Sequence, residues 1–345
     1  MLTERRARIL DLVIGEYVQT AVPVGSKSIA RKYQLGISPA TIRNEMARLE
    51  EDGYITHPHT SAGRIPSDKG YRYYVESLME EEELPREVRE TVRHQFHQAR
   101  REQEEWVHLA AAILAALVRN AAIVTLPHSA RSRLKHLELI EVRDFVALVV
   151  AVLDQAVVRQ QVITLPEPLS QDELTAMATR LNGVFGDLTA AEMAQGSVGL
   201  SAVEELVIAA LREMMETIDR GGYGDAYLEG VRHMLSQPEF ARSDKMLDIL
   251  ELLDEHALPR LIPLSALAGE GVTIIIGREN WPDLPSDQAS AIGQCSVVVT
   301  GYGSPVWGAG AMAVVGPTRM HYPQTISTVR YMAEVMSELM ASYSN

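Results

Sequence analysis

The stretch from Ser38 to Arg48 combines side chains that are suited to reading DNA bases. Ser38 followed by Pro39 predicts a helix start, because serine is a good N-cap and proline suits the first helical position. Within that helix, Arg43 can donate two hydrogen bonds to a guanine and Asn44 can pair with an adenine. Each good pair adds about 1–3 kcal/mol of discrimination between bases. The stretch therefore predicts a recognition helix that enters the major groove.

Other candidate contacts surround this helix. Ala40 and the methyl group of Thr41 can touch a thymine methyl group, while side chains on the preceding helix and the following loop can hold phosphates. Lys69 is a further basic residue near that loop. The candidate DNA-contacting residues are Lys27, Ser28, Arg31, Ser38, Pro39, Ala40, Thr41, Arg43, Asn44, Arg48, His59, Ser61 and Arg64.

Charge is distributed unevenly along the 345 residues, whose formal net charge is −14. Residues 1–79 carry 11 Lys/Arg and 9 Asp/Glu, so the later residues hold the negative excess. Within 26–48, five basic residues stand against Glu45 alone. An acidic remainder repels nucleic acid and favours solubility, so the pattern indicates a small polyanion-binding module at the N-terminus.

The elements expected around these residues form a winged helix-turn-helix. The third helix is expected to bury Ile42, Met46 and Leu49, which repeat at helical spacing. The predicted order is a helix near 4–19, a second capped by Ser26, a third ending at Gly53, short strands at 54–56 and 65–66, and a fourth helix capped by Ser67.

The remaining chain predicts an α+β body with a helical insertion. A nearly unbroken a/d seam from Val88 to Leu117 predicts one helix over 86–120, roughly 50 Å long. It could pair with itself in a dimer or pack on the body. Strands are expected at 123–126, 134–142, 145–153, 157–165, 272–276, 296–300 and 311–315, and helices from Ser170 to Leu181, over 200–257 and over 325–343.

Several classes of protein and site are not expected. Cys295 is the only cysteine, which excludes an internal disulfide framework and a multi-cysteine metal site. Apolar runs such as 145–153 are far shorter than the ~20 residues of a membrane span, and no signal peptide is evident. No nucleophile elbow, paired catalytic carboxylates or phosphate loop can be identified. We therefore expect a cytoplasmic protein without catalytic residues, cofactor or metal.

Longer motifs resemble those of the bacterial heat-inducible transcription repressor HrcA family. The N-terminal motifs are Pro23–Ser26, Ser38–Met46, Leu49–Ile55 and the wing Pro58–Ser67, which continues into Gly70–Val75. The later motifs, in the family's order, are Tyr227–Gly230, Pro238–Phe240, Ile276–Glu279 and Gly316–Tyr322.

The resemblance implies a homodimeric repressor that binds an inverted repeat, the CIRCE element, upstream of chaperone operons and is kept active by the GroE chaperonin. It implies a winged-helix domain over 1–80, a linker helix and GAF-like domain over 85–155 and 262–345, and an inserted, mostly helical dimerising domain over 156–261. We further hypothesise that the repressor's own folding equilibrium senses heat.

Two alternatives remain open at this point. GAF-like domains often bind small molecules, so a ligand-sensing repressor could hold a metabolite near Arg278, Glu279, Tyr302 and Arg319. These residues could equally be structural turns and interface groups. An enzyme within residues 100–345 that carries an appended DNA-binding module is the second alternative.

Overall fold

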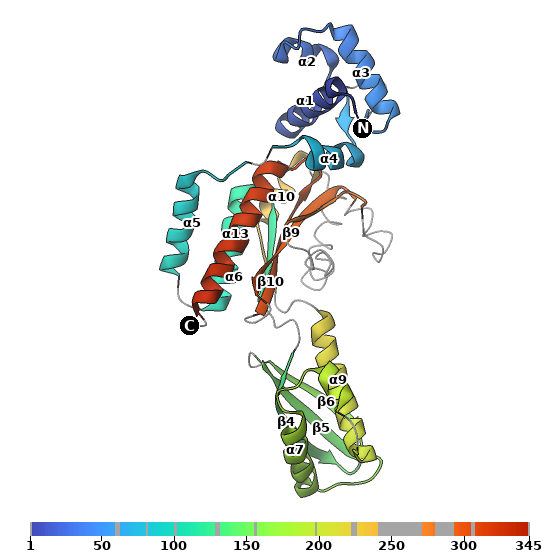
Figure 1. The fold of residues 1–345 in the computed structure, drawn as a ribbon, viewed down its shortest axis with the longest axis vertical. Coiled ribbons are helices and arrows are strands. Elements are labelled where there is room, and N and C mark those ends of the chain that lie inside the picture. Colours follow the sequence, from blue (N-terminus) through green and yellow to red (C-terminus); the bar gives the residue numbers. More distant parts are fainter. Residues whose placement is uncertain are drawn as a thin grey trace.

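The chain is a multi-domain α+β protein with three parts arranged along its longest axis (Figure 1). The computed structural model describes residues 2–58, 63–80, 82–99, 102–127, 132–154, 157–196, 199–221, 226–240, 271–279, 293–304 and 308–343. We call the first part the N-terminal unit (residues 2–80) and the third the insert (residues 132–221). The second part, the body, consists of a five-stranded sheet and the helices α5 (Arg86–Gln98), α6 (Gln103–Val118), α10 (Val231–Leu235) and α13 (Tyr322–Tyr343).

The N-terminal unit has the element order expected from the sequence. It consists of α1 (Glu4–Thr20), α2 (Ser26–Tyr33), α3 (Pro39–Glu51), β1 (Ile55–Thr56), β2 (Ile65–Pro66) and α4 (Asp68–Tyr73), followed by a π-helical turn at Tyr74–Leu78. β1 and β2 pair antiparallel. Ser67 caps α4 through a 3.1 Å hydrogen bond from the Gly70 amide, as predicted.

One predicted cap in this unit is wrong. Gly25, not Ser26, is the N-cap of α2, and no side chain caps that end. Ser26 is the first helical residue and is buried. Glycine is acceptable at an N-cap, so the helix starts one residue earlier than the serine signal suggested.

The body is built on a five-stranded antiparallel sheet in the order β7-β3-β10-β9-β8. Its helices α6 and α13 lie against one face of that sheet, while α10 and the turn at Pro238–Phe240 pack on the other face (Figure 1). The strands are β3 (Ala121–Thr125), β7 (Ala226–Glu229), β8 (Thr273–Ile276), β9 (Cys295–Ser304) and β10 (Gly308–Pro317), and the helices are α10 (Val231–Leu235) and α13 (Tyr322–Tyr343).

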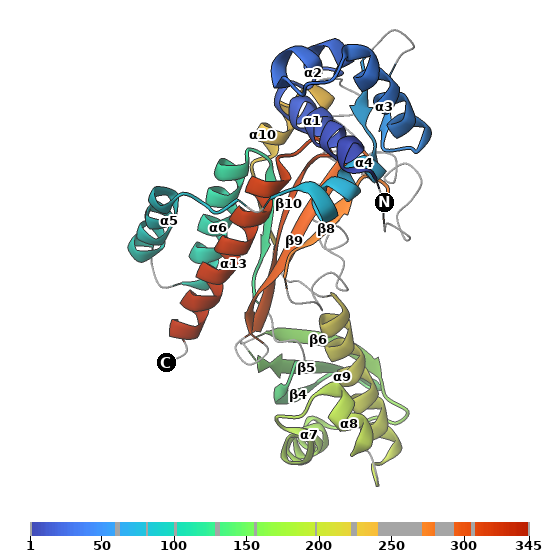
Figure 2. The same ribbon diagram turned by 45° about the horizontal axis from the view of Figure 1, so that its top comes forward.

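The predicted single helix over 86–120 is wrong. The structure has α5 (Arg86–Gln98) and α6 (Gln103–Val118), with Ala99 extended at φ −67° and ψ 149°. α6 buries Trp106, Ala110 and Leu114 in the body, whereas α5 buries only Val92 and Phe96. The two helices lie beside each other in both views (Figures 1 and 2), so folding back covers apolar residues that a straight helix would expose. Tertiary packing has overridden helix propensity.

The insert has its own sheet and its own core. Strands β4 (Leu134–Arg143), β5 (Val146–Leu153) and β6 (Val158–Thr164) form an antiparallel sheet, and one face of it is covered by helices. The helices are α7 (Gln171–Phe185), α8 (Ala190–Gln195) and α9 (Ala202–Gly221). Ser170 caps α7 in a full capping box with Glu173.

Sheet membership differs from the expected domain boundaries at both ends of the insert. The strands over 134–153, expected in the body, form a sheet with β6 instead. Conversely, β7 interrupts the predicted helix over 200–257 and pairs with β3, where Thr125 faces Ala226. A four-residue segment such as Ala226–Glu229 is too short to be assigned to helix or strand by periodicity, and its partner lies about a hundred residues earlier in the chain. Residues 241–257 of that predicted helix lie outside the described residues.

Candidate nucleic-acid interface

The face of α3 that points away from the core carries the predicted base-reading side chains. Ile42, Met46 and Leu49 are buried, as predicted, and this fixes the rotation of the helix. Arg43, Asn44 and Arg48 are consequently exposed, as are Ser38, Pro39 and Ala40 at the N-terminal end of the helix. Side chains at the start of such a helix are the ones that reach base edges in helix-turn-helix proteins.

Ser38 and Thr41 are partly occupied by the helix cap. The Ser38 hydroxyl accepts a hydrogen bond from the Thr41 amide at 3.1 Å, and the two hydroxyls lie 3.0 Å apart. Ser38 with Pro39 at the first helical position therefore starts α3 as the sequence predicted. Thr41 is half-buried, so its methyl group is less accessible than the side chain of Ala40.

Helix α2 adds three more of the predicted contacts beside α3. Lys27, Ser28 and Arg31 are exposed, while Ile29 is fully buried and anchors the helix. Helices α2 and α3 lie next to each other at the end of the molecule farthest from the insert (Figure 1). The structure thus brings the predicted α2 and α3 residues onto one end of the N-terminal unit.

The predicted basic contacts on α2 and α3 have no acidic partner among the described residues, whereas other basic residues of the N-terminal unit do. Within the part of the chain that the structure describes, Lys27, Arg31, Arg43 and Arg48 make no ion pair. By contrast, Arg6 pairs with Glu45 at 3.1 Å and with Asp52 at 3.3 Å, and Lys32 pairs with Glu16. The positive charge that remains available for an anion is therefore concentrated on α2 and α3.

Glu45 on α3 is an acidic residue whose role the sequence did not reveal. Its side chain is 13% exposed and accepts a hydrogen bond from Arg6 Nε of α1 at 3.1 Å. The neighbouring Arg5 lies 3.9 Å away. These contacts offset the one negative charge within 26–48 and tie α3 to α1. No sequence signal identifies a pair 39 residues apart.

Arg64, predicted as a wing contact to DNA, is engaged inside the unit. Its backbone exchanges hydrogen bonds with Val24 at 2.8 and 2.9 Å, and its guanidinium pairs with Glu50 of α3 at 2.6 Å. Glu50 also pairs with His57. Burial alone would raise the pKa of Glu50, but the hydrogen bonds and charges of His57 and Arg64 hold that pKa below its ordinary value. Arg64, which immediately precedes β2, thus joins this strand to α3.

Two of the predicted contacts, His59 and Ser61, lie outside the described residues. Lys69 donates a hydrogen bond to the Asp52 carbonyl at 2.7 Å and lies over the Tyr54 ring. It therefore stabilises the end of α3.

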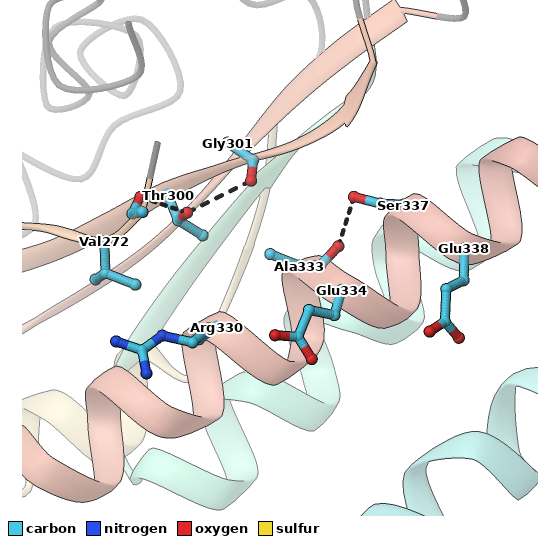
Figure 3. A pocket seen from close by; sticks show the side chains of 9 residues that line it. Val272, Thr300, Gly301, Arg330, Ala333, Glu334, Ser337 and Glu338 are labelled. Carbon is cyan, nitrogen blue, oxygen red and sulfur yellow. Dashed lines mark hydrogen bonds between the residues drawn. The ribbon is translucent and has the colours of Figure 1, made fainter. Parts of the chain in front are cut away.

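A cavity of about 410 Å³ lies between strands β8 and β9 and helix α13 (Figure 3). Its hydroxyl groups are already used: Ser337 donates to the Ala333 carbonyl at 2.7 Å, and Thr300 donates to the Gly271 carbonyl at 2.9 Å. Figure 3 shows Arg330 and Glu338 pointing in different directions along α13. Polar groups do not converge on one point here, as they do in a specific small-molecule site.

The residues named for a possible metabolite site do not line this cavity. Glu279 and Arg319 instead contact the N-terminal unit, and Tyr302 is buried with its hydroxyl donating to the Thr125 carbonyl. Glu279 and Arg319 are therefore interface groups, and Tyr302 is a core group. This agrees with the alternative that these residues have a structural role.

The described residues contain no group of three or more His, Cys, Asp or Glu side chains placed to hold a metal ion. None of their helices combines the length and apolar character needed to cross a membrane.

The chain is similar in sequence to known proteins over almost its whole length. The family model of the HrcA protein C-terminal domain matches residues 104–326. The heat-inducible transcription repressor HrcA of Roseiflexus castenholzii is 42% identical, over 99% of this chain and 95% of that protein. The HrcA of Dehalococcoides mccartyi is 40% identical, over 99% and 96%.

A crystal structure of a hypothetical protein has a similar fold, with a TM-score of 0.58 and 22% identity over 99% of this chain and 98% of that one. The identity to the named repressors extends over both the N-terminal unit and the body. These relatives are transcription repressors, not enzymes. The chain belongs to the HrcA family of heat-inducible transcription repressors.

Proposed function

We propose that this protein represses chaperone operons by binding an inverted repeat of the CIRCE type as a homodimer, and that the GroE chaperonin maintains its active form. The observation that carries the DNA-binding part is the set of exposed cations on α2 and α3 that have no acidic partner among the described residues. Such a protein acts in the cytoplasm, where the chromosome is.

The proposed roles of the site residues follow from their positions. Arg43 and Asn44 read base edges, and Ala40 and Thr41 supply apolar contacts to a thymine methyl group. Phosphates are held, and the register is set, by the hydroxyl or basic side chains of Lys27, Ser28, Arg31, Ser38 and Arg48. Pro39, which has no donor, makes a van der Waals contact beside them. Arg64 orients the wing, whose His59 and Ser61 approach the duplex.

The three parts of the chain correspond to three functions in this proposal. The N-terminal unit acts as a winged helix, the five-stranded body is a GAF-like domain, and the insert dimerises. Its strands β4 to β6 and helices α7 to α9 support revised insert boundaries of about 132–221 in place of 156–261.

The outer face of the insert sheet supports a role in dimerisation. Ile140, Leu148 and Val162 lie in one row across β4, β5 and β6, on the face opposite the covering helices. Ile140 is 41% exposed and Val162 is 61% exposed. A contiguous apolar surface on a folded unit commonly marks a protein contact. A two-fold dimer would place two α3 helices on the two halves of an inverted repeat.

The chaperonin part of the proposal rests on the family resemblance and on stability arguments. A partner that favours the folded repressor over its unfolded chain raises the active population by mass action. Occupation of that partner by unfolded protein would withdraw this support as temperature rises.

Electrophoretic mobility shift on DNA with an inverted repeat tests the proposal. The repressor, with and without GroE, is titrated on the repeat and on a scrambled sequence of equal length at rising temperature. We expect preference for the repeat and higher active fractions with GroE. The double variant Arg43→Ala/Asn44→Ala should lose that preference, whereas the control Arg86→Ala, an exposed arginine of α5 paired with Glu90, should keep it. Equal binding of both DNAs by the parent protein would overturn the proposal.

A further inference from the structure

The N-terminal unit is fastened to the body by two arginines that point in opposite directions. The first, Arg319, lies between β10 and α13 and reaches into the last turn of α1, where its Nη1 donates to the Val18 carbonyl at 2.6 Å. Its Nε donates to Glu239 at 2.5 Å and its Nη2 donates to Gln237 at 2.9 Å. All three guanidinium nitrogens are therefore engaged, and the side chain is 12% exposed.

Arg319 supplies a positive charge at the C-terminal end of α1. The last carbonyls of a helix have no partner within the helix and form its negative end, and α1 has no basic residue in its last turn. The body thus provides the positive charge that complements this helix end. Glu239 and Gln237 hold the guanidinium in place, so the contact has a fixed geometry.

The second arginine, Arg72, belongs to α4 and reaches the body. Its Nη2 donates to the Ile274 carbonyl of β8 at 2.8 Å, and its Nε donates to Glu279 at 3.0 Å. Arg72 is 27% exposed and Glu279 is 29% exposed. Because Arg72 and Arg319 hold different helices of the unit, rotation about either contact is blocked by the other.

The surface between the two arginines is closely packed. Tyr71 of α4 and Tyr322 of α13 are both buried, and their ring centroids lie 5.8 Å apart. Gly277 has φ +55°, and a Cβ atom there would lie 2.3 Å from the Asp68 carboxylate of α4. The two parts therefore approach as closely as the segments of one core, with the hydrophobic cluster continuous across them.

Because the N-terminal unit is held rigidly against the body, its orientation limits which operators a dimer can bind. In a dimer, the separation and angle of the two α3 helices are then set by the body and insert. Two such helices serve symmetric half-sites only when these lie about 34 Å apart, or a multiple of that distance. Units on flexible linkers would accept many separations.

We propose that Arg319 and Arg72 are positioning residues that determine which half-site spacing the repressor accepts. They touch no DNA; they act by holding α3 at a fixed orientation to the body. This inference rests on the proposed binding of a dimer to an inverted repeat. The contacts that would select the spacing are made by α1 and α4, on the side of the N-terminal unit that faces the body, and not by α3.

A spacer series tests the inference. Affinity is measured on inverted repeats at the best spacing, with one, two and about five base pairs added, the last being half a helical turn, and on a single half-site. The parent should lose affinity steeply as the spacer changes. Arg319→Ala should weaken binding at the best spacing by on the order of tenfold, flatten the dependence on spacer, and leave the half-site affinity unchanged. The control Arg93→Ala, which removes a body ion pair with Glu338, should behave as the parent.

A distance measurement without DNA separates this inference from the proposed function. Spin labels at Glu51→Cys on α3 and Glu104→Cys on α6 should give a narrow distance distribution in the parent and a broad one in Arg319→Ala. A broad distribution in the parent, or an unchanged spacer profile in a folded variant, would overturn the inference. A narrow distribution in a parent that ignores inverted repeats would instead overturn the proposed function. If Arg319→Ala fails to fold by circular dichroism, Arg72→Gln is read in the same two assays.

Discussion

The guanidinium of Arg64 lies against the carboxylate of Glu50, with 2.6 Å between Nη2 and Oε2. Arg64 immediately precedes β2, in the proposed wing, and Glu50 lies in the last turn of the proposed recognition helix. The pair therefore couples the orientation of the wing to that of α3.

Arg64→Ala should weaken DNA binding by displacing the wing, without removing a phosphate contact. We expect the affinity to fall while the slope of log affinity against log salt stays at the parent value, because no counterion release is lost. Fluorescence anisotropy over a range of salt concentrations measures both. A slope reduced by about one would assign Arg64 to a phosphate instead.

Lys27→Ala should weaken binding on every DNA sequence and reduce the salt slope by about one, since one phosphate contact is lost. The matched control is Lys32→Ala on the same helix, because Lys32 is engaged with Glu16. We expect the control to keep the slope of the parent. Identical slopes for Lys27→Ala and the parent would remove Lys27 from the phosphate contacts.

Arg43→Ala and Asn44→Ala should each lose about 1–3 kcal/mol of specific binding and relax the base preference at one position. Competition binding with a set of operators mutated at single positions measures this. A uniform loss across all operators, as expected of a phosphate contact, would contradict a base-reading role for the residue tested.

Acid should destabilise the N-terminal unit through Glu16, a buried carboxylate of α1. Hydrogen bonds from Lys32 and Tyr33 of α2 hold the pKa of Glu16 below its usual value. The folded form therefore binds its proton less readily than the unfolded chain, so this stabilisation is present above the unfolded pKa. It is lost as pH falls through the folded pKa.

Urea unfolding monitored between pH 7 and pH 3 measures that loss. Glu16→Gln should be less stable than the parent at pH 7 and should show a smaller decrease toward low pH. Parallel curves for the two proteins would mean that Glu16 does not titrate differently on folding.

Cys295 should be inert in the folded body and reactive once the body opens. Burial raises the pKa of its thiol to about 12, so almost no thiolate is present at pH 8. A thiol reagent added at increasing temperature should react at the rate at which the body unfolds. Fast reaction in the cold, native protein would contradict the buried position.

Local signals predicted much of the N-terminal unit. Ser38 with Pro39 marks a helix start by chemistry that acts within a few residues, and the spacing of Ile42, Met46 and Leu49 fixes which face of the helix is exposed. The same spacing therefore identified Arg43 and Asn44 as outward-facing residues. Strand β5 of the insert was predictable for a similar reason, because Val146–Leu153 is an unbroken apolar run.

Features set by distant partners were not predictable in this way. The seam from Val88 to Leu117 reads as one helix, because its break near Ala99 is caused by packing on the body rather than by a glycine or proline. Arg72 and Glu279 meet across 207 residues of sequence, so spacing gives no sign of the pair. The same applies to Arg64 and Glu50, whose pairing changes the role expected of a wing arginine.

The pairing of Thr125 with Ala226 brings the two ends of the insert together at one edge of the body. The insert, with its three-stranded sheet, follows the end of β3 and precedes the start of β7. These two strand ends are neighbours, because β3 and β7 pair antiparallel. A short turn in place of the insert would connect β3 to β7 as a hairpin and leave the other strands of the five-stranded sheet in place. The body is thus topologically complete without the insert, which has a sheet and a core of its own.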